Sequence, residues 1–145
     1  MGDHFLQRPI YVDLPSMIEL GIRVIHGEWS AVSTACVSPS FLTENGEAIL
    51  RWTEAPNEPL NIEAGADTGV GRVVLQFYTI GSAGHARCPV TLATGLQSDE
   101  ARPAETPRLA IELPTELELV ERFARECIAL GSDLKHEARL TVLPE

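Results

Sequence analysis

Apolar and polar residues alternate along most of this chain, and this period of two constrains the fold more than any other feature. Leu20, Ile22 and Val24 are apolar, and Gly21 and Arg23 lie between them. Successive side chains of a β-strand point to opposite faces of its sheet, so such a segment predicts a strand with one buried face and one wet face. The same alternation recurs in residues 48–52, 60–63, 73–77, 88–92, 109–113 and 138–142. It predicts seven or eight strands.

Two glycine-containing segments predict tight antiparallel connections. Asn45 and Gly46 tolerate positive φ, which is typical of a type I′ turn, so we expect them to join two strands of a hairpin. Residues 81–84 (GSAG) are expected to form a second hairpin. Pro89 follows in the next strand and has no N–H to donate to a neighbouring strand, which predicts a sheet edge or a bulge there.

One amphipathic helix is expected between about residues 116 and 130. Thr115 is a favourable N-cap, and Glu118 three residues later completes a capping box. Gly131 follows as the expected stop signal. The apolar residues recur at spacings of three and four, which places them on one face of the helix: Leu117, Val120, Phe123, Ala124, Cys127, Ile128 and Leu130.

Many strands followed by a late helix predict an α+β fold that is mainly β. We expect seven or eight antiparallel strands in a twisted sheet or sandwich, with the C-terminal helix packed on it. The length of 145 residues fits a single domain over 1–145. Residues 95–107 are polar, contain two prolines and show no period, which predicts a mobile loop within the domain.

The charge of the chain bears on its partners. The net charge is −10, from 21 acidic and 11 basic residues, and this charge repels phosphate and anionic lipid. Neither nucleic acid nor a membrane is therefore an expected partner, whereas a basic protein would be attracted. Three cysteines without a C-x-x-C spacing argue against a disulfide framework or structural zinc. With no targeting signal at the start, they favour the cytoplasm.

The sharpest catalytic motif is Asp67-Thr68-Gly69, because aspartic proteases present their catalytic carboxylate in a D-T-G loop. A small, β-rich chain that dimerises would bring two such loops together. The alternative is an ordinary turn, since the motif lies in a glycine-rich stretch where Asp and Gly are favoured for their backbone conformations.

His26 and Glu28 form half of a zinc-deaminase motif, in which a His binds the metal and a Glu transfers the proton. The partner P-C-x-x-C is absent, so a solvated turn is the simpler interpretation. No spacing pairs a cysteine with a histidine, and Cys127 on the apolar helix face is expected to be a buried, unreactive thiol. Gly65 to Gly71 lacks the Lys-Ser/Thr of a phosphate loop, and no cofactor is expected.

A patch for partner binding is a further candidate. Trp52 begins a stretch rich in Pro and Glu, and its ring beside Glu54 and Glu58 would suit a protein contact. The alternative is a hydrophobic lid over the end of a sheet.

The C-terminal segment from Arg108 to Leu143 resembles small bacterial immunity proteins of polymorphic toxin systems. The similarity consists of an alternating strand (RLAIEL), a helix of the type LxxVxxFAxxxxAL and a final strand of the type xEARLxV. It covers about a quarter of the chain and concerns patterning rather than chemistry. The resemblance implies a protein that neutralises a toxin by binding it, and an acidic chain would suit a basic nuclease toxin.

These observations favour a non-enzymatic binding domain in the bacterial cytoplasm, because no group of polar residues converges in the sequence. A hydrolase that uses Asp67 is the first alternative. The second is a structural subunit that self-associates into a homo-oligomer through the helix or through an exposed sheet edge, for instance near Pro89.

Overall fold

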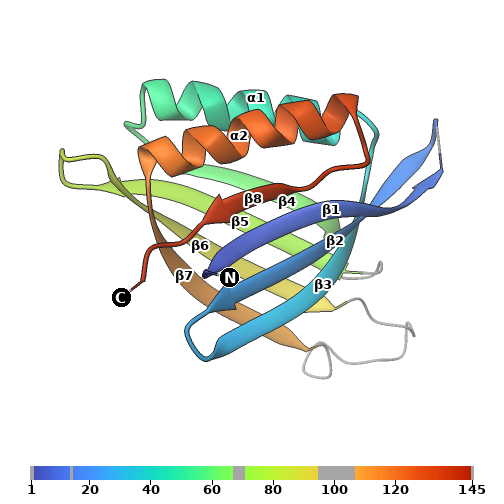
Figure 1. Cartoon of the computed structure of the whole chain (residues 1–145), viewed down its shortest axis with the longest axis horizontal. Coiled ribbons are helices and arrows are strands. Elements are labelled where there is room, and N and C mark those ends of the chain that lie inside the picture. Colours follow the sequence, from blue (N-terminus) through green and yellow to red (C-terminus); the bar gives the residue numbers. More distant parts are fainter. Residues whose placement is uncertain (1, 14, 67–70, 95–106, 145) are drawn as a thin grey trace.

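The computed structural model describes residues 2–13, 15–66, 71–94 and 107–144. It contains eight strands and two helices (Figure 1). In chain order they are β1 (His4–Asp13), β2 (Met17–His26), β3 (Trp29–Val37), α1 (Phe41–Glu54), β4 (Leu60–Ala66), β5 (Gly71–Ile80), β6 (His85–Thr94), β7 (Arg108–Glu116), α2 (Leu117–Ser132) and β8 (Ala138–Thr141). Neither helix has the length and apolar character that crossing a bilayer requires.

The strands form two antiparallel sheets of four. The first sheet has the order β3-β2-β1-β8 and the second the order β4-β5-β6-β7. All pairs of neighbouring strands are antiparallel. The predicted fold class, α+β and mainly β with a C-terminal helix, is therefore confirmed.

The two sheets repeat one topology. In the second sheet, four strands follow one another along the chain and lead into α2. In the first sheet, β1, β2 and β3 lead into α1 in the same way, and β8 from the other end of the chain supplies the strand beside β1. The first sheet and α1 thus correspond to the second sheet and α2, with β8 and β1 in the places of β4 and β5. The N- and C-termini lie at the point where a β8–β1 connection would be.

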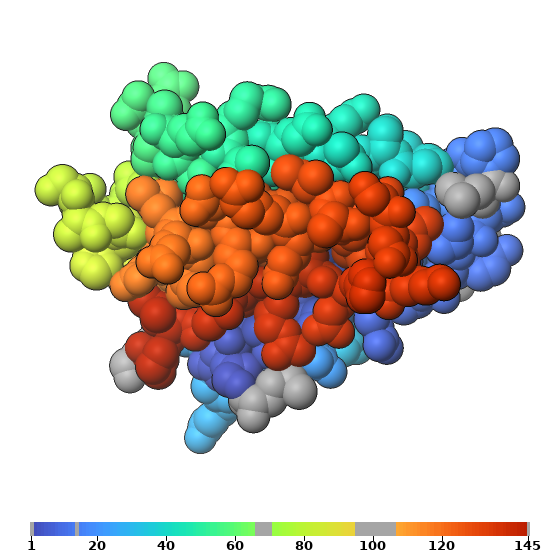
Figure 2. All heavy atoms as spheres, turned by 45° about the horizontal axis from the view of Figure 1, so that its top comes forward, coloured from blue at the N-terminus to red at the C-terminus, as the bar shows by residue number. Residues whose placement is uncertain are grey.

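The helices α1 and α2 lie side by side across one side of the sheets (Figures 1 and 2). Gly46 on α1 allows this close approach, because a Cβ there would lie 3.0 Å from the backbone nitrogen of Ile128 on α2. Gly131 on α2 lies against Thr43 of α1 in the same way. Gly131 is therefore a packing residue inside α2, which continues to Ser132, and not the expected stop.

The hairpin predicted at Asn45-Gly46 and the strand predicted at 48–52 are wrong, because both lie inside α1. Leu42, Ile49 and Trp52 are buried at helical spacings on one side of this helix. The second predicted hairpin is confirmed, since residues 81–84 join β5 to β6.

The predicted start of the C-terminal helix is also corrected. Thr115 belongs to β7, and its buried hydroxyl donates a hydrogen bond to the Thr141 carbonyl at 3.0 Å. Glu116 occupies the N-cap position and makes no capping bond through its side chain. Thr115 thus connects the second sheet to the end of β8 in the first.

Pro89 does not lie on an edge strand, because β6 is paired with both β5 and β7. The pairing with β5 is interrupted between Val90 and Arg87, and the register is the same on both sides of the gap. The missing N–H therefore leaves a gap in the ladder without a bulge. Edge-to-edge self-association near Pro89 has no free edge to use.

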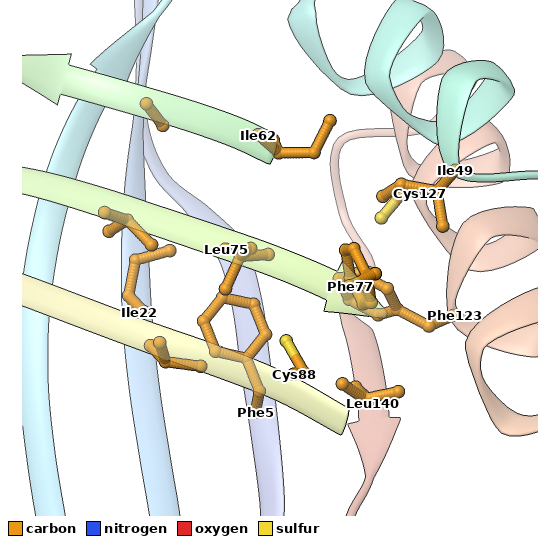
Figure 3. Packing of buried hydrophobic residues seen from close by; sticks show 14 of the residues in the cluster. Phe5, Ile22, Ile49, Ile62, Leu75, Phe77, Cys88, Phe123, Cys127 and Leu140 are labelled. Atoms are coloured by element: carbon orange, nitrogen blue, oxygen red, sulfur yellow. The ribbon is translucent and has the colours of Figure 1, made fainter. Parts of the chain in front are cut away.

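One hydrophobic cluster connects both sheets and both helices (Figure 3). The Phe5 ring on β1 meets the Phe123 ring on α2 edge-on, with centroids 5.9 Å apart. Trp52 on α1 and Phe77 on β5 are in contact at 5.8 Å. Burial of each such side chain contributes about 1.5 to 3 kcal/mol to folding, so these contacts hold the helix layer on the sheets. The loop predicted at 95–107 lies, apart from Pro107, outside the described residues.

Candidate binding site

The face of the first sheet that points away from the core is not covered by α1 or α2 (Figure 1). The alternation predicted from the sequence divides its residues: Ile22 points to the core, while Gly21 and Arg23 point outward. We call this surface, formed by outward residues of β1, β2 and β3, the open face.

A hollow of about 520 Å³ lies on the open face, within the range typical of ligand pockets. Its lining is mainly apolar and comes chiefly from three adjacent strands: Leu6, Arg8 and Ile10 of β1, Gly21 and Arg23 of β2, and Val32 of β3. The register places Arg8 opposite Gly21 and Leu6 opposite Arg23, so these side chains share one face.

An irregularity in β1 shapes one end of the hollow. The register between β1 and β2 shifts between Pro9 and Tyr11, so Ile10 is an extra residue in its strand. Gly21 lies beneath it, and a Cβ on Gly21 would be 2.8 Å from Ile10 Cγ2. The absence of a side chain at Gly21 therefore lets Ile10 lie across β2.

Exposed apolar side chains surround the hollow. Val32 is 73% exposed and Ile10 is 49% exposed, whereas Leu6, which also lines the hollow, is buried. Tyr11, at 57% exposure, continues the apolar surface toward the β1–β2 hairpin. Contiguous exposed apolar surface of this kind marks interaction sites in folded proteins.

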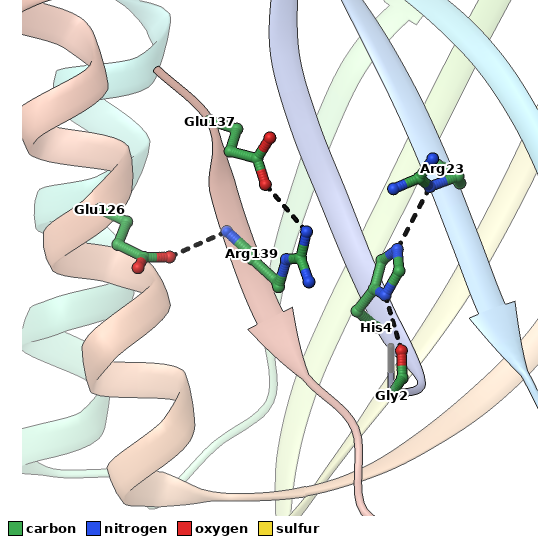
Figure 4. A network of polar contacts seen from close by, with 6 residues as sticks. All are labelled: Gly2, His4, Arg23, Glu126, Glu137 and Arg139. Atoms are coloured by element: carbon green, nitrogen blue, oxygen red, sulfur yellow. Dashed lines mark hydrogen bonds and ion pairs between the residues drawn. The ribbon is translucent and has the colours of Figure 1, made fainter.

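Two arginines provide positive charge at the hollow. Arg23 Nε donates to His4 Nε2 at 3.2 Å, and His4 Nδ1 lies 2.8 Å from the Gly2 carbonyl oxygen (Figure 4). A neutral His4 that carries its proton on Nδ1 satisfies both contacts and holds Arg23 in place. The Arg8 guanidinium has no ion pair or hydrogen bond within the described part of the chain.

One acidic residue, Glu137, also lines the hollow. Its carboxylate accepts a hydrogen bond from Arg139 Nη2 at 3.0 Å (Figure 4). Among the described residues that line the hollow, arginines therefore outnumber carboxylates, whereas the chain as a whole has a net charge of −10.

His26 and Glu28, the candidate metal ligands, have other surroundings in the structure. His26 Nδ1 lies 3.0 Å from an Asp3 carboxylate oxygen, which also accepts the Gly27 backbone N–H at 3.0 Å. The Gly27 N–H is the main reason that the pKa of Asp3 is lowered. Glu28 is exposed in the turn after β2, and no group of three potential metal ligands occurs among the described residues. The contacts of His26 instead tie the N-terminus to the β2–β3 turn.

The cysteines show no sign of an activated thiol. Burial raises the pKa of Cys127 to about 12, and Gln7 Nε2 donates a hydrogen bond to its sulfur at 3.2 Å. Burial raises the pKa of Cys88 as well, and desolvation does so for the half-buried Cys36. Since the thiolate is the nucleophile, raised pKa values keep these thiols unreactive near neutral pH.

The remaining candidates are placed differently. Asp67, with the rest of its D-T-G motif, lies outside the described residues. Trp52 is only 7% exposed, and its Nε1 donates to the Glu58 carbonyl oxygen at 2.7 Å, so its ring belongs to the core. The side chains of Glu54 and Glu58 are exposed near the end of α1.

Sequence reasoning missed most of the hollow. It placed Gly21 and Arg23 on the wet side of a strand, but it did not identify β1 or β3, which contribute Arg8 and Val32. The exposure of an apolar residue such as Val32 carries no mark in the sequence, because it depends on which elements cover the sheet.

Comparison of the chain with family models, with curated proteins and with solved structures finds no match in any of the three.

Proposed function

We propose that this protein is a non-enzymatic binding domain that contacts another protein through the open face of its first sheet. The observation that carries the proposal is the hollow of about 520 Å³ with Val32 exposed to 73% at its side. Exposing apolar surface beside a concave site is unfavourable in isolation, and a partner that covers it gains the free energy of its burial.

The chemistry of the described residues supports binding rather than covalent catalysis. Among the described residues, arginines, hydroxyl groups and one carboxylate line the hollow, and no cysteine or histidine side chain does. Such a lining orients a partner through hydrogen bonds and charge, while its apolar part supplies affinity.

A charged side chain at Val32 tests this proposal. We expect Val32→Glu to weaken binding about tenfold or more, because it buries a carboxylate against apolar surface. The matched control is Ile80→Glu, since Ile80 is also exposed, at 44%, but lies at the β5–β6 hairpin. Proteins retained by the immobilised wild type from a lysate of the expressing cells would be identified, purified and measured by titration calorimetry. A purified partner that binds Val32→Glu as tightly as wild type contradicts the proposal, as does the lack of any partner.

We further propose that the partner is a basic toxin in a bacterial cytoplasm, as the resemblance to immunity proteins implies. Charge supports this narrower proposal: Glu44, Glu47 and Glu54 are exposed along α1, and Arg51 is the basic residue of its last turn. Such a surface attracts basic proteins and accelerates association.

Growth of a bacterial host tests the toxin proposal. Expression of a gene adjacent to this one should arrest growth, and co-expression of this protein should restore it. Replacement of Glu44, Glu47 and Glu54 by Gln should reduce that protection. Adjacent genes that are harmless, or toxicity that this protein does not relieve, would contradict it.

A further inference from the structure

Two arginines and one glutamate are the charged residues among the described residues that line the hollow, although the chain as a whole is acidic. Arg8 lies opposite Gly21, and Arg23 is two residues further along the same strand, so the two arginines are diagonal neighbours on the open face. Side chains in this relation start about 7 to 8 Å apart, within reach of a single carboxylate between them. The Arg8 guanidinium makes no ion pair or hydrogen bond with the described residues, and the carboxylate of Glu137, which lines the same hollow, is bonded to Arg139 instead.

The shape of the hollow favours a peptide over a small molecule. A site that binds a small ligand typically encloses about 70 to 90% of the ligand's surface. This hollow is not enclosed to that degree, because Val32 at its side is 73% exposed. A chain that crosses the hollow would extend beyond it onto Ile10 and Tyr11, which are also exposed. From β8 to β3 the sheet measures about 14 Å, at about 4.8 Å between strands, which four or five extended residues span.

From this arrangement we infer that the hollow binds an extended segment of a partner protein in which an Asp or Glu lies between apolar residues. The carboxylate binds at Arg8 and Arg23, and the apolar neighbours cover Ile10 and Val32. Arg23 Nε donates a hydrogen bond to His4 Nε2, with 3.2 Å between the two atoms, so this arginine is oriented before the segment binds. The inference rests on the proposed function and adds the chemistry of the partner.

Selection from a phage-displayed library of random peptides tests the inference. The library would be selected in parallel on wild type, on Arg8→Glu and on Arg122→Glu. Arg122 is the matched control, because it is exposed on α2 and its substitution changes the net charge equally. Wild type and Arg122→Glu should enrich peptides with an acidic residue flanked by apolar residues, and Arg8→Glu should not. Thermal unfolding of each variant checks that it is folded.

A double-mutant cycle with one synthetic selected peptide completes the test. Arg8→Glu should weaken its binding about tenfold to a hundredfold, as loss of a charge-assisted hydrogen bond does. Changing the acidic residue of the peptide to its amide should cost a similar factor in wild type and much less in Arg8→Glu.

Three outcomes separate the possible failures. Selected peptides that bind Arg8→Glu as well as wild type, or that lack an acidic residue, overturn the inference. If binding is nevertheless lost in Val32→Glu, the open face remains the site and only the charge assignment falls. If no selected peptide is sensitive to Val32→Glu while a purified partner protein is, the extended segment is excluded and the proposed function stands.

Discussion

The side-chain carboxylate of Glu126 on α2 accepts a hydrogen bond from the backbone N–H of Arg139 on β8, with 2.9 Å between the two atoms (Figure 4). The strand β8 pairs with β1 on one side and with no other described strand. The Glu126 carboxylate therefore binds the Arg139 backbone N–H, which is a hydrogen-bond donor on the free edge of the first sheet. Such blocking of an edge prevents further strands from adding to the sheet.

Replacement of Glu126 should destabilise the protein. In Glu126→Ala the Arg139 N–H loses its acceptor, and we expect the free energy of unfolding to fall by about 1 to 2 kcal/mol. Glu118→Ala is the matched control, because Glu118 is exposed on the same helix and undergoes the same change of helix propensity. Urea unfolding measures both, and equal effects of the two substitutions would contradict the assigned role.

The contact between the helices predicts an unusual response to a small substitution. Gly46→Ala would normally stabilise a helix, but here the new Cβ meets Ile128 Cγ1 at 2.8 Å and the Ala124 carbonyl oxygen at 3.0 Å. We expect a net loss of about 1 to 2 kcal/mol, because overpacking outweighs the gain in helix propensity. Adding Ile128→Ala should make the Gly46→Ala penalty smaller in a thermodynamic cycle. A stabilised Gly46→Ala protein would show that the helices are further apart.

Thiol reactivity should follow burial. Cys36 is half-buried, whereas Cys88 and Cys127 are buried, and burial raises the pKa of both buried thiols. A thiol reagent at mildly alkaline pH should therefore modify Cys36 first and the other two only on unfolding. Cys36→Ser should remove the fast phase and leave the slow one unchanged. A fast phase that persists in this variant would mean that another cysteine is accessible.

The pair Tyr78 and Glu112 predicts a stability change at alkaline pH. The Tyr78 hydroxyl donates to the Glu112 carboxylate at 2.8 Å, and this hydrogen bond is the main reason that the pKa of Tyr78 is raised. The folded state thus holds the phenolic proton more tightly than the unfolded state. The stabilisation is present below the usual tyrosine pKa of about 10 and is lost as the pH rises through the folded value.

Ultraviolet titration in a Tyr11→Phe background measures this shift, because Tyr78 is then the remaining tyrosine of the two in the chain. Glu112→Gln should lower the pKa of Tyr78 toward its usual value, and Tyr78→Phe should reduce the alkaline loss of stability. An unchanged Tyr78 titration in Glu112→Gln would show that the hydrogen bond does not form in solution.

Much of the fold follows from local patterns. Alternation along Val73, Leu75 and Phe77 predicts β5, and apolar spacings of three and four predict α2, because each pattern reports which side of one element faces the core. The turn at 81–84 is similarly local, with Gly81 and Gly84 at φ values of 67° and 86°. These elements need no knowledge of their partners.

Errors occurred where a residue serves a distant contact. Asn45-Gly46 suggests a turn, yet Gly46 is glycine because α2 passes beside it. Thr115 suggests a cap, yet its hydroxyl bonds to Thr141. Glycine is favoured both in turns and where two helices pack closely. Threonine is favoured both as a helix cap and as a donor of a long-range hydrogen bond, so neither residue type alone distinguishes the two roles.

The sequence by itself determined most of the strands, the second helix and the division of β2 into a buried and a wet side, since these depend on the order of side chains along one segment. The tertiary structure alone decided that α1 is a helix and that Arg8, Arg23 and Val32 meet at one hollow. The physical reason is that the exposure of a side chain depends on what covers it. The helices cover one side of these sheets and not the open face, and no single segment can specify this arrangement.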